Sequence, residues 1–446
     1  MNYILFDPPV SSMLYSHRKA NTCLTNFLPF MFTRPLAEMR VFGGTIKEIW
    51  ENYLGCKVSY FSHAHLADLY PIFLHNQEIN VFIPSYYLPN PNVKRNSGKT
   101  HYIRNGHDQV MGTYTDENAI FYNTTNKVLG YTSKSKTHGD MPSFSNDGKF
   151  FNVDNICLNQ KKFSEMNKEE KSQDFREMEA SGLRKNLSEA FDLAFSKIEK
   201  EKNPKFIKLD LSHMLDNMIN FSEHKVSNID CSQSPFLNDD DGPIIIEEDV
   251  TIMEGAMIRG PVHICKGSVI KMGAKIYGPT IIGPYCKISG EVSNSIFLGY
   301  SNKAHDGFLG HSIIGEWCNI GAGTSNSNLK NNYETVKMWD YWDKKFKDSE
   351  KQFLGLYMGD HTKCAINTSF NTGTTVGVNC NIFGSGFPRN YISSFSWGGT
   401  SGYKDYDIEK ALQTAKIVMK RRGVKMSSEY EKMLREVFSM TASFRN

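Results

Sequence analysis

Isoleucine recurs at every sixth position through a long stretch in the second half of the chain. The series is Ile246, Ile252, Ile258, Ile264, Ile270, Ile276, Ile282 and Ile288. This period fits neither the 3.6-residue repeat of an α-helix nor the two-residue alternation of an open strand. It is typical of a parallel β-helix, in which each hexapeptide supplies one strand and one corner. The pattern therefore predicts a β-helix whose core is filled by β-branched side chains.

The same phase returns further along the chain, so the coils are expected to run from about residue 244 to about residue 386. The later members are Met358, Cys364, Phe370, Val376 and Ile382. Between the two series, residues 325–353 are polar and aromatic and break the period. This segment is predicted to be a loop that projects from one corner, and long loops in such repeats are often functional.

A second break, at residues 289–307, carries the residues best suited to chemistry. A corner lined only by isoleucine has no group able to move a proton. The coil is therefore expected to open here, so that Lys303, His305 and Asp306 reach a groove. Phe308 is then expected to restart the core. The alternative is that His305 is simply a corner residue of a structural coil.

A zinc site is not expected on the coils. His305 and His311 lie six residues apart, which places them on different faces of one coil. The positions one coil away from His305 are Lys287 and Gly323, so no histidine stacks beside it. The nine cysteines are scattered without C-x-x-C spacing, which argues against a disulfide framework and favours a reducing cytoplasm.

The N-terminal half has the pattern of an α/β domain. The run "YILF", which ends before Asp7, predicts the first strand of a Rossmann-like nucleotide-binding domain. The run "TIKEIWENYL" predicts a helix, and residues 79–89, "INVFIPSYYLP", predict a further strand. Residues 160–225 are highly charged and predict solvated helices.

These patterns predict three parts along the chain. The α/β domain occupies residues 1–235 and the β-helix residues 236–402. A helical tail, residues 403–446, follows. Two helices are expected in it, at about 405–421 and 427–441, and they would cap the open end of the β-helix.

The composition limits the range of partners. Of the 446 residues, 40% are hydrophobic and 22% are charged, and the net charge is +3. This balance is typical of a globular protein and predicts no nucleic-acid partner. No apolar run is long enough for a membrane span, and the first residues lack the features of a signal peptide. A cytoplasmic protein that acts on small molecules is expected.

The run "KAHDGFLGHSIIGEWCNIGAGTSNSN", residues 303–328, resembles a motif of the left-handed β-helix acyltransferases. It is most similar to the acetyltransferase half of the bifunctional glucosamine-1-phosphate acetyltransferases/N-acetylglucosamine-1-phosphate uridyltransferases. The resemblance implies that His305 is the base for an amine proton and that Asn319 contacts the amino-sugar acceptor. It also implies that Ala322 and Gly323 line the groove for acetyl-CoA, and that the protein is a homotrimer.

The chain departs from that family's pattern at two places. Phe308 stands where the family has a tyrosine, so this substrate-binding position offers no hydroxyl group. Tyr277 and residues 289–291 stand where the family has a lysine and an arginine that hold the substrate phosphate. The phosphate site is therefore expected to be rebuilt from Lys303 or Lys330.

The run "RPLAEMRVFGGTIKEIWENYLG" resembles a segment of the sugar nucleotidyltransferases, but their glycine-rich phosphate loop is absent. The resemblance implies that Arg34 and Arg40, with Asp7, bind the nucleoside triphosphate. An ion-paired surface segment is the alternative for the two arginines. The run "HGDMP" mimics a magnesium-binding motif, but no apolar strand precedes Asp140, so this segment is interpreted as a loop.

Taken together, the two resemblances imply a sugar-1-phosphate nucleotidyltransferase domain fused to a left-handed β-helix acyltransferase domain. The implied reactants are a nucleoside triphosphate with Mg²⁺, a sugar 1-phosphate and acetyl-CoA, and the implied product is of the UDP-N-acetylglucosamine type. Two rival hypotheses remain. In one, the β-helix only trimerises the protein. In the other, only the acyltransferase is active, because the phosphate loop is missing.

Overall fold

The computed structural model describes residues 2–7, 27–73, 80–85, 87–89, 101–104, 110–114, 120–123, 127–131, 206–208 and 236–445. The chain divides into two compact units. The first comprises Met1–Thr25, Arg34–Glu38 and Thr45–Leu209, and the second comprises Asn26–Thr33, Met39–Gly44 and Asp210–Asn446. Asp140 and most of the predicted helical region 160–225 lie outside the described residues.

The first unit contains a five-stranded mixed sheet in the order β10–β9–β5–β1–β4. Its strands are β1 (Asn2–Phe6), β4 (Val58–Phe61), β5 (Asn80–Pro84), β9 (Ile120–Asn123) and β10 (Lys127–Tyr131). β1 pairs in parallel with β4 on one side and with β5 on the other, whereas β9 pairs antiparallel with both of its neighbours. The ends of the three parallel strands therefore meet at one edge, and the predicted first strand is confirmed.

The predicted helix of this unit is α1 (Ile46–Leu54), and its ends follow from local chemistry. The Thr45 hydroxyl accepts a hydrogen bond from the Glu48 amide, while the Glu48 carboxylate accepts one from the Thr45 amide. Gly55, with φ of 69°, ends the helix in the left-handed region. The other elements are η3 (Leu36–Glu38), β3 (Gly44–Thr45), η4 (Ala64–Leu66), β6 (Tyr87–Pro89), β7 (His101–Arg104), β8 (Val110–Tyr114) and β11 (Phe206–Lys208).

One short stretch of the region 160–225 is described, and it corrects the helical prediction there. β11 is a strand that pairs antiparallel with β6, so that Ile207 lies opposite Leu88. The predicted strand at 79–89 is present as β5 and β6, separated at residues 85–86.

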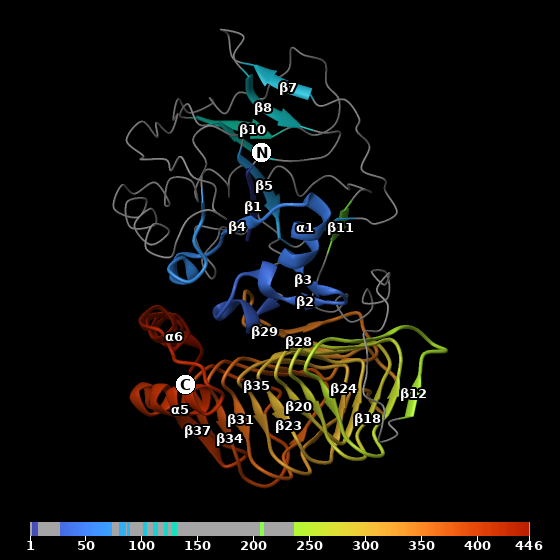
Figure 1. Cartoon of the computed structure of the whole chain (residues 1–446). Helices are drawn as coiled ribbons and strands as arrows, with labels where there is room; N and C mark the ends of the chain where they lie inside the picture. Colours follow the sequence, from blue (N-terminus) through green and yellow to red (C-terminus); the bar gives the residue numbers. More distant parts are fainter. Residues whose placement is uncertain are drawn as a thin grey trace. The chain divides into compact units, whose positions relative to one another are not determined.

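The second unit is a parallel β-solenoid of three sheets, as the six-residue period predicts (Figure 1). The first sheet contains β12 (Phe236–Asn238), β15 (Met257–Arg259), β18 (Lys275–Tyr277), β21 (Glu291–Ser293) and β24 (Phe308–Gly310). The second contains β13 (Ile244–Ile246), β16 (Val262–Ile264), β19 (Thr280–Ile282), β22 (Ile296–Gly299), β25 (Ile313–Glu316), β30 (Leu356–Met358), β33 (Thr374–Val376) and β35 (Tyr391–Ile392). The third contains β14 (Thr251–Ile252), β17 (Val269–Ile270), β20 (Lys287–Ile288), β23 (Asn302–Lys303), β26 (Asn319–Ile320), β31 (Lys363–Cys364), β34 (Asn381–Ile382), β36 (Ser396–Gly399) and β37 (Gly402–Asp405). A further pair, β27 (Ser325–Asn326) and β32 (Ser369–Phe370), is also parallel.

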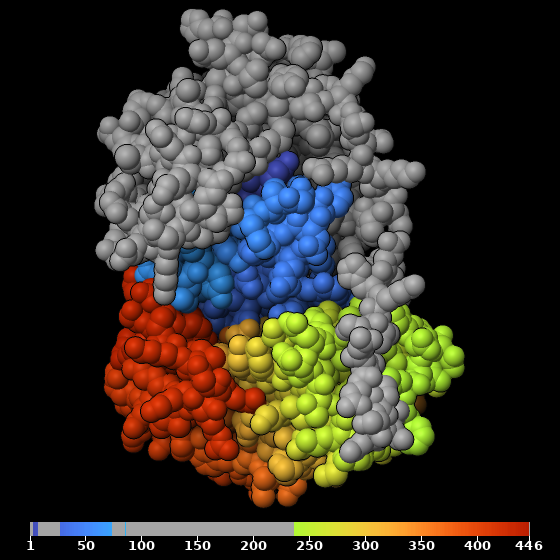
Figure 2. Space-filling view, viewed as in Figure 1, coloured from blue at the N-terminus to red at the C-terminus, as the bar shows by residue number. Residues whose placement is uncertain are grey.

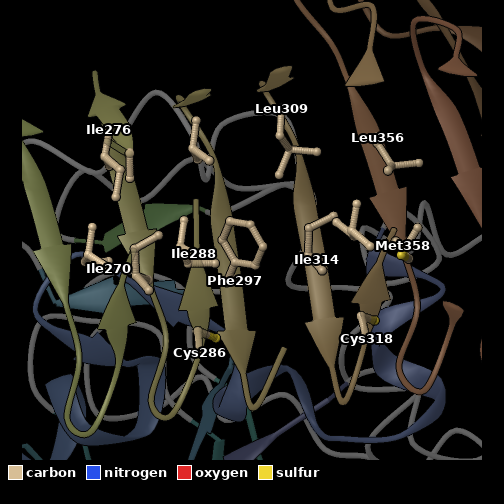
Figure 3. Close-up of a cluster of buried hydrophobic side chains, with 14 of the residues drawn as sticks. Ile270, Ile276, Cys286, Ile288, Phe297, Leu309, Ile314, Cys318, Leu356 and Met358 are labelled. Atoms are coloured by element: carbon tan, nitrogen blue, oxygen red, sulfur yellow. The ribbon is translucent and has the colours of Figure 1, made fainter. Parts of the chain in front are cut away.

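The inward-facing side chains form continuous rows through the solenoid, as Figure 3 shows for one part of it. Ile270, Ile276, Ile288, Phe297, Ile314 and Met358 are all buried in this core. Cys286 and Cys318 are buried with them and are free thiols. The cysteines of the coils thus act as small core residues, as their scatter in the sequence predicts.

The solenoid does not open at residues 289–307, which corrects the sequence-based expectation. Ile276 pairs with Val292, and Ile288 pairs with Lys303, so the strands stay in register through this stretch. The six-residue phase is lost because this coil has shorter corners. Phe308 does not restart the core, since Leu309 occupies the inward position and pairs with Val292.

The predicted projecting loop is instead folded back on the solenoid. Within residues 325–353, β28 (Lys337–Asp340) and β29 (Lys345–Asp348) form an antiparallel hairpin. The ring of Trp339 stacks on Tyr391, with centroids 3.9 Å apart. Tyr341 is 2% exposed and also packs against Tyr391. The aromatic residues of this segment therefore attach it to the coils.

Two helices follow the coils, as predicted: α5 (Ile408–Arg421) and α6 (Ser428–Met440), with η7 (Ala442–Phe444) after them. They lie toward the end of the solenoid away from β12 (Figures 1 and 2). Arg422 reaches back to Asn302 of β23. The helices therefore lie along the flank of several coils, rather than over the last coil alone. No helix in the described stretches is long and apolar enough to cross a membrane.

Two short N-terminal segments belong to the solenoid unit. η2 (Phe30–Phe32) brings Phe32 against Tyr341, with ring centroids 5.6 Å apart. Thr33 donates a hydrogen bond of 2.8 Å to the buried Asp360 carboxylate. In β2 (Arg40–Val41), the Arg40 guanidinium donates to the carbonyl oxygen of Leu298. These two short segments therefore complete one flank of the solenoid.

Candidate functional site

A groove of about 670 Å³ lies between the third sheet of the solenoid and the end of α5. Three of the residues singled out in the sequence line it, namely His305, Asn319 and Ala322. His305 and Asn319 are exposed, so their side chains are open to a ligand. These three residues of the motif at 303–328 therefore lie at one groove.

His305 sits at the corner that follows β23. Its backbone carbonyl accepts a hydrogen bond of 2.9 Å from the Nζ atom of Lys303. Gly323, which is next to the groove-lining Ala322, donates its amide to the carbonyl oxygen of Asp306 at 3.0 Å. The corner is therefore fixed by one contact within the coil and one contact to the coil above it.

Asn319 is linked to the C-terminal helix through a second asparagine. The Asn302 amide donates to the Asn319 side-chain oxygen at 3.4 Å. The Asn302 side-chain oxygen accepts a hydrogen bond of 2.6 Å from the Arg422 guanidinium. This relay places Arg422 at the groove with a fixed orientation, and Arg422 lines the groove itself.

The structure corrects the expectation that Lys303 reaches the groove. Its side chain is 1% exposed and takes an inward position between Ile288 and the next coil. Its Nζ atom donates to the carbonyl oxygens of Ser289 and His305. Burial lowers the pKa of Lys303 to about 8. Lys303 therefore supports the corner that carries His305, and it is not among the residues that line the groove.

Phe308 and Lys330, the other predicted substrate-binding residues, are also not among the lining residues of this groove. The Phe308 amide donates to the Ser325 hydroxyl. The Lys330 Nζ atom donates to the carbonyl oxygen of Thr335 at 2.6 Å and lies 3.8 Å from the Glu334 carboxylate. Lys330 therefore stabilises the segment 325–353, to which it belongs.

Four cations that the sequence reasoning missed line the groove: Lys287, Lys363, Arg421 and Arg422. The positive charge of Arg422, together with burial, lowers the pKa of Lys287. Burial lowers the pKa of Lys363 to about 8, and its Nζ atom donates to the His361 carbonyl oxygen. Lys287 stood one coil from His305 in the sequence pattern, whereas no local signal links the two arginines to this motif.

Aromatic rings form a stack along the corner beside the groove. The Tyr285 and Tyr300 centroids are 5.1 Å apart, and those of Tyr300 and Trp317 are 4.2 Å apart. Trp317 lies 6.1 Å from His361, the next ring in the stack. All four residues have φ between 52° and 61°, a region that bulky side chains rarely occupy. Tyr300 and Trp317 line the groove, so the stack gives it one rigid apolar wall.

In the first unit, three polar residues meet where three parallel strands end. Asp7 follows β1, Ser62 follows β4 and Ser85 follows β5. The Asp7 carboxylate accepts hydrogen bonds from both serine hydroxyls and from the Leu36 amide. Burial raises the pKa of Asp7 to about 6, although these hydrogen bonds oppose the rise.

The three predicted nucleotide-binding residues belong to different units, Asp7 and Arg34 to the first unit and Arg40 to the solenoid unit. Asp7 is 1% exposed and holds the segment that contains Arg34, through its contact with Leu36. Arg34 is 5% exposed. Arg40 belongs to the solenoid unit, where its guanidinium contacts the Leu298 carbonyl oxygen and lies 3.7 Å from the Cys265 sulfur. These contacts give Arg40 a structural role on the solenoid. Binding of the nucleotide by Arg40 stays a prediction.

One cluster in the described residues has the side-chain types of a metal site. Potential ligand atoms of Glu247, His263 and Cys265 all lie within 4.8 Å of one another. The Glu247 carboxylate is 2.7 Å from the His263 Nε2 atom, and the Arg40 guanidinium faces Cys265. Burial lowers the pKa of His263, but its contacts with Cys265 and Glu247 outweigh this and raise it to about 9. The arrangement therefore fits an ion pair under the Arg40 segment.

Residues 20–161 match the family model described as "Sugar nucleotidyl transferase". Two curated proteins are similar to parts of the chain. A bifunctional sugar-1-phosphate nucleotidylyltransferase/acetyltransferase of Sulfurisphaera tokodaii is 32% identical over 32% of this chain and 35% of its own length. The bifunctional protein GlmU of Methanocaldococcus jannaschii is 34% identical over 27% of this chain and 25% of its own length. The chain thus spans about a third or less of the length of these relatives.

Two solved structures resemble part of the chain. A UDP-N-acetylglucosamine acyltransferase from Campylobacter jejuni is 13% identical, covering 45% of this chain and 90% of that chain, with a TM-score of 0.21. A UDP-N-acetylglucosamine acyltransferase from Bacteroides fragilis is 14% identical, covering 45% of this chain and 95% of that chain, with a TM-score of 0.19. The sequence similarities therefore relate the chain to two kinds of transferase, the nucleotidyl transferases and the acetyltransferases.

Proposed function

We propose that the protein makes a nucleotide-activated amino sugar by two transfers, one in each unit. In the first unit, a phosphate oxygen of a sugar 1-phosphate attacks the α-phosphorus of a nucleoside triphosphate and displaces pyrophosphate. In the solenoid groove, an acetyl group passes from acetyl-CoA to the amine of a sugar phosphate. The match of residues 20–161 to sugar nucleotidyl transferases and the similarity to bifunctional relatives support this pairing.

The observation that carries the acetyl transfer is the shared groove of His305 and Asn319. In this reaction the amine nitrogen attacks the thioester carbonyl, so a C–N bond forms and the C–S bond breaks. His305 is exposed at the groove and takes the proton that the amine releases. The thiolate of the donor leaves and is protonated. Asn319, which Asn302 holds in place, orients the acceptor sugar.

The product is proposed to be of the UDP-N-acetylglucosamine type, and the active form a homotrimer in the cytoplasm, where the free cysteines stay reduced. The trimer is tested by light scattering at micromolar concentration. A monomer that still transfers acetyl groups would rule the trimer out. The nucleotide-binding role of Arg34 is tested by Arg34→Ala, which should abolish pyrophosphate release and leave thiol release unchanged.

The activity itself is tested by incubating the protein with amino-sugar 1-phosphates, each nucleoside triphosphate and acetyl-CoA. Pyrophosphate release and thiol release are followed separately. Both products are expected. Thiol release without pyrophosphate would support the hypothesis that only the acyltransferase is active. Pyrophosphate without thiol would support a solenoid that serves only for assembly.

A further inference from the structure

The groove collects positive charge without a matching negative group. Lys287, Lys363, Arg421 and Arg422 line it, and none of the residues that line it is an aspartate or a glutamate. Like charges held close together repel one another, and burial makes that repulsion stronger. An anion bound among these side chains would relieve the repulsion.

A hydrogen bond holds one of these cations at the groove. The Asn302 side chain accepts a hydrogen bond of 2.6 Å from Arg422 and so fixes its orientation. Arg422 is itself half-buried, and it is the largest cause of the lowered pKa of Lys287. The hydrogen bond to Asn302 keeps the guanidinium of Arg422 near Lys287. The cations therefore form a prearranged group beside His305 and Asn319.

We infer that Arg422, Arg421 and Lys287 bind the phosphate of a phosphorylated small-molecule substrate at the acetyl-transfer groove. This inference rests on the proposed function and names the residues that hold the phosphate. A guanidinium fixed by a neighbouring amide is suited to phosphate, because its N–H groups point in a set direction. The end of α5 thus supplies positive charge for the phosphate. Lys303 and Lys330 do not, because both donate hydrogen bonds to backbone carbonyl oxygens.

Two substrates of the proposed reaction carry phosphate. One is the acceptor sugar 1-phosphate, and the other is the acyl donor, whose nucleotide part has a diphosphate and a 3′-phosphate. Asn302 connects Arg422 to Asn319, the residue proposed to hold the acceptor. The two sources are distinguished by using a separate probe for each.

Binding is measured by isothermal titration calorimetry on the full chain, with glucosamine 1-phosphate and 3′-phosphoadenosine 5′-phosphate as separate probes. The variants are Arg422→Gln and Lys287→Gln. Lys287 is exposed, so its replacement leaves the fold intact even if Arg422→Gln does not fold. The matched control is Lys416→Gln, which removes the same charge from α5 but breaks only an ion pair with Glu431.

Each groove variant is expected to weaken binding of at least one probe by roughly 10- to 100-fold, since a charge-assisted contact to phosphate is lost. The Lys416→Gln protein should bind as the unchanged protein does. The probe whose binding falls identifies the source of the phosphate. Unchanged affinity for both probes in both groove variants would overturn the inference, and so would an equal loss in Lys416→Gln. Because the readout is binding, the inference can hold even if no acetyl transfer is detected.

Discussion

The ammonium group of Lys303 donates a hydrogen bond of 2.9 Å to the backbone carbonyl oxygen of His305. A buried cation inside the solenoid thus holds the corner that presents the proposed base to the groove. The aliphatic part of Lys303 continues the inward row of Ile252, Ile270 and Ile288. The residue combines a core position with support of the site, although it does not line the groove.

Replacing Lys303 by methionine keeps the apolar length and removes the ammonium. Burial lowers the pKa of Lys303 to about 8 in the folded protein, below the ordinary value of 10.5. The unfolded chain then holds the proton more tightly, so the charged lysine costs stability below about pH 8. The unfolding free energy of the unchanged protein should therefore rise relative to Lys303→Met between pH 8 and 10.5, by up to about 3 kcal/mol.

Urea unfolding of both proteins across this pH range measures the difference. The tyrosines that titrate in the same range are common to both proteins and cancel. The acetyl-transfer rate of Lys303→Met should also fall, because the His305 corner loses its anchor. A difference in unfolding free energy that does not change with pH would contradict the buried ammonium.

Replacing His305 by alanine should lower the acetyl-transfer rate by roughly 10²- to 10⁴-fold, the usual contribution of a positioned acid–base group. The melting temperature should barely change, because the side chain is exposed. Thiol release from acetyl-CoA, measured alongside a melting curve, tests both expectations. His311→Ala is the control, since His311 bonds to Asn328 and is not among the residues that line the groove. A structural role for His305 would instead lower the melting temperature and leave the rate intact.

Asp7 should make the first unit less stable as pH rises. Burial raises its pKa to about 6, from an ordinary value of 3.8. The folded state therefore holds the proton more tightly, and the contribution of Asp7 to stability is lost as pH rises from about 4 through 6. Hydrogen–deuterium exchange of β1 and β4 should be slower at pH 5 than at pH 7.5, after correction for intrinsic rates. Asp7→Asn should remove this dependence, and its persistence in that variant would refute the assignment.

The Glu247–His263 pair should stabilise the start of the solenoid in a pH-dependent way. The pKa of His263 is raised to about 9, so the stability it adds is complete below pH 6.5 and is lost as pH rises through 9. Hydrogen exchange of β13 and β16, the strands beside the pair, should accelerate over that range, beyond the intrinsic rate. Glu247→Gln should give fast exchange already at pH 7. The control Glu248→Gln, in an exposed ion pair with Lys266, should have little effect.

The sequence revealed the solenoid because its coils repeat a local rule, by which every sixth side chain must fill the core. It could not reveal the shortened coil after Ile288, since a change in corner length leaves no periodic signal and only makes the series stop. Val292, Phe297 and Lys303 continue the inward row at unequal spacing. The interrupted period therefore predicts an opening that the structure does not have.

The candidate site was predictable only where it is local in the chain. His305 and Asn319 fall in one short motif, and the structure places both at one groove. Arg422 is 120 residues from its partner Asn302. A helix that packs on the flank brings them together, and nothing in the pattern of the last residues indicates that docking. For the same reason the contact between Arg40 and Leu298 could not be foreseen.

The early segments that complete the solenoid flank impose an order on the synthesis of the protein. Thr33 emerges from the ribosome 327 residues before its partner Asp360. At typical translation rates this is a wait of roughly 15 to 60 seconds. Throughout that interval Phe30 and Phe32, which are fully buried in the finished protein, have no coil to rest on. Residues 30–33 can therefore reach their final positions only after the later coils have been synthesised.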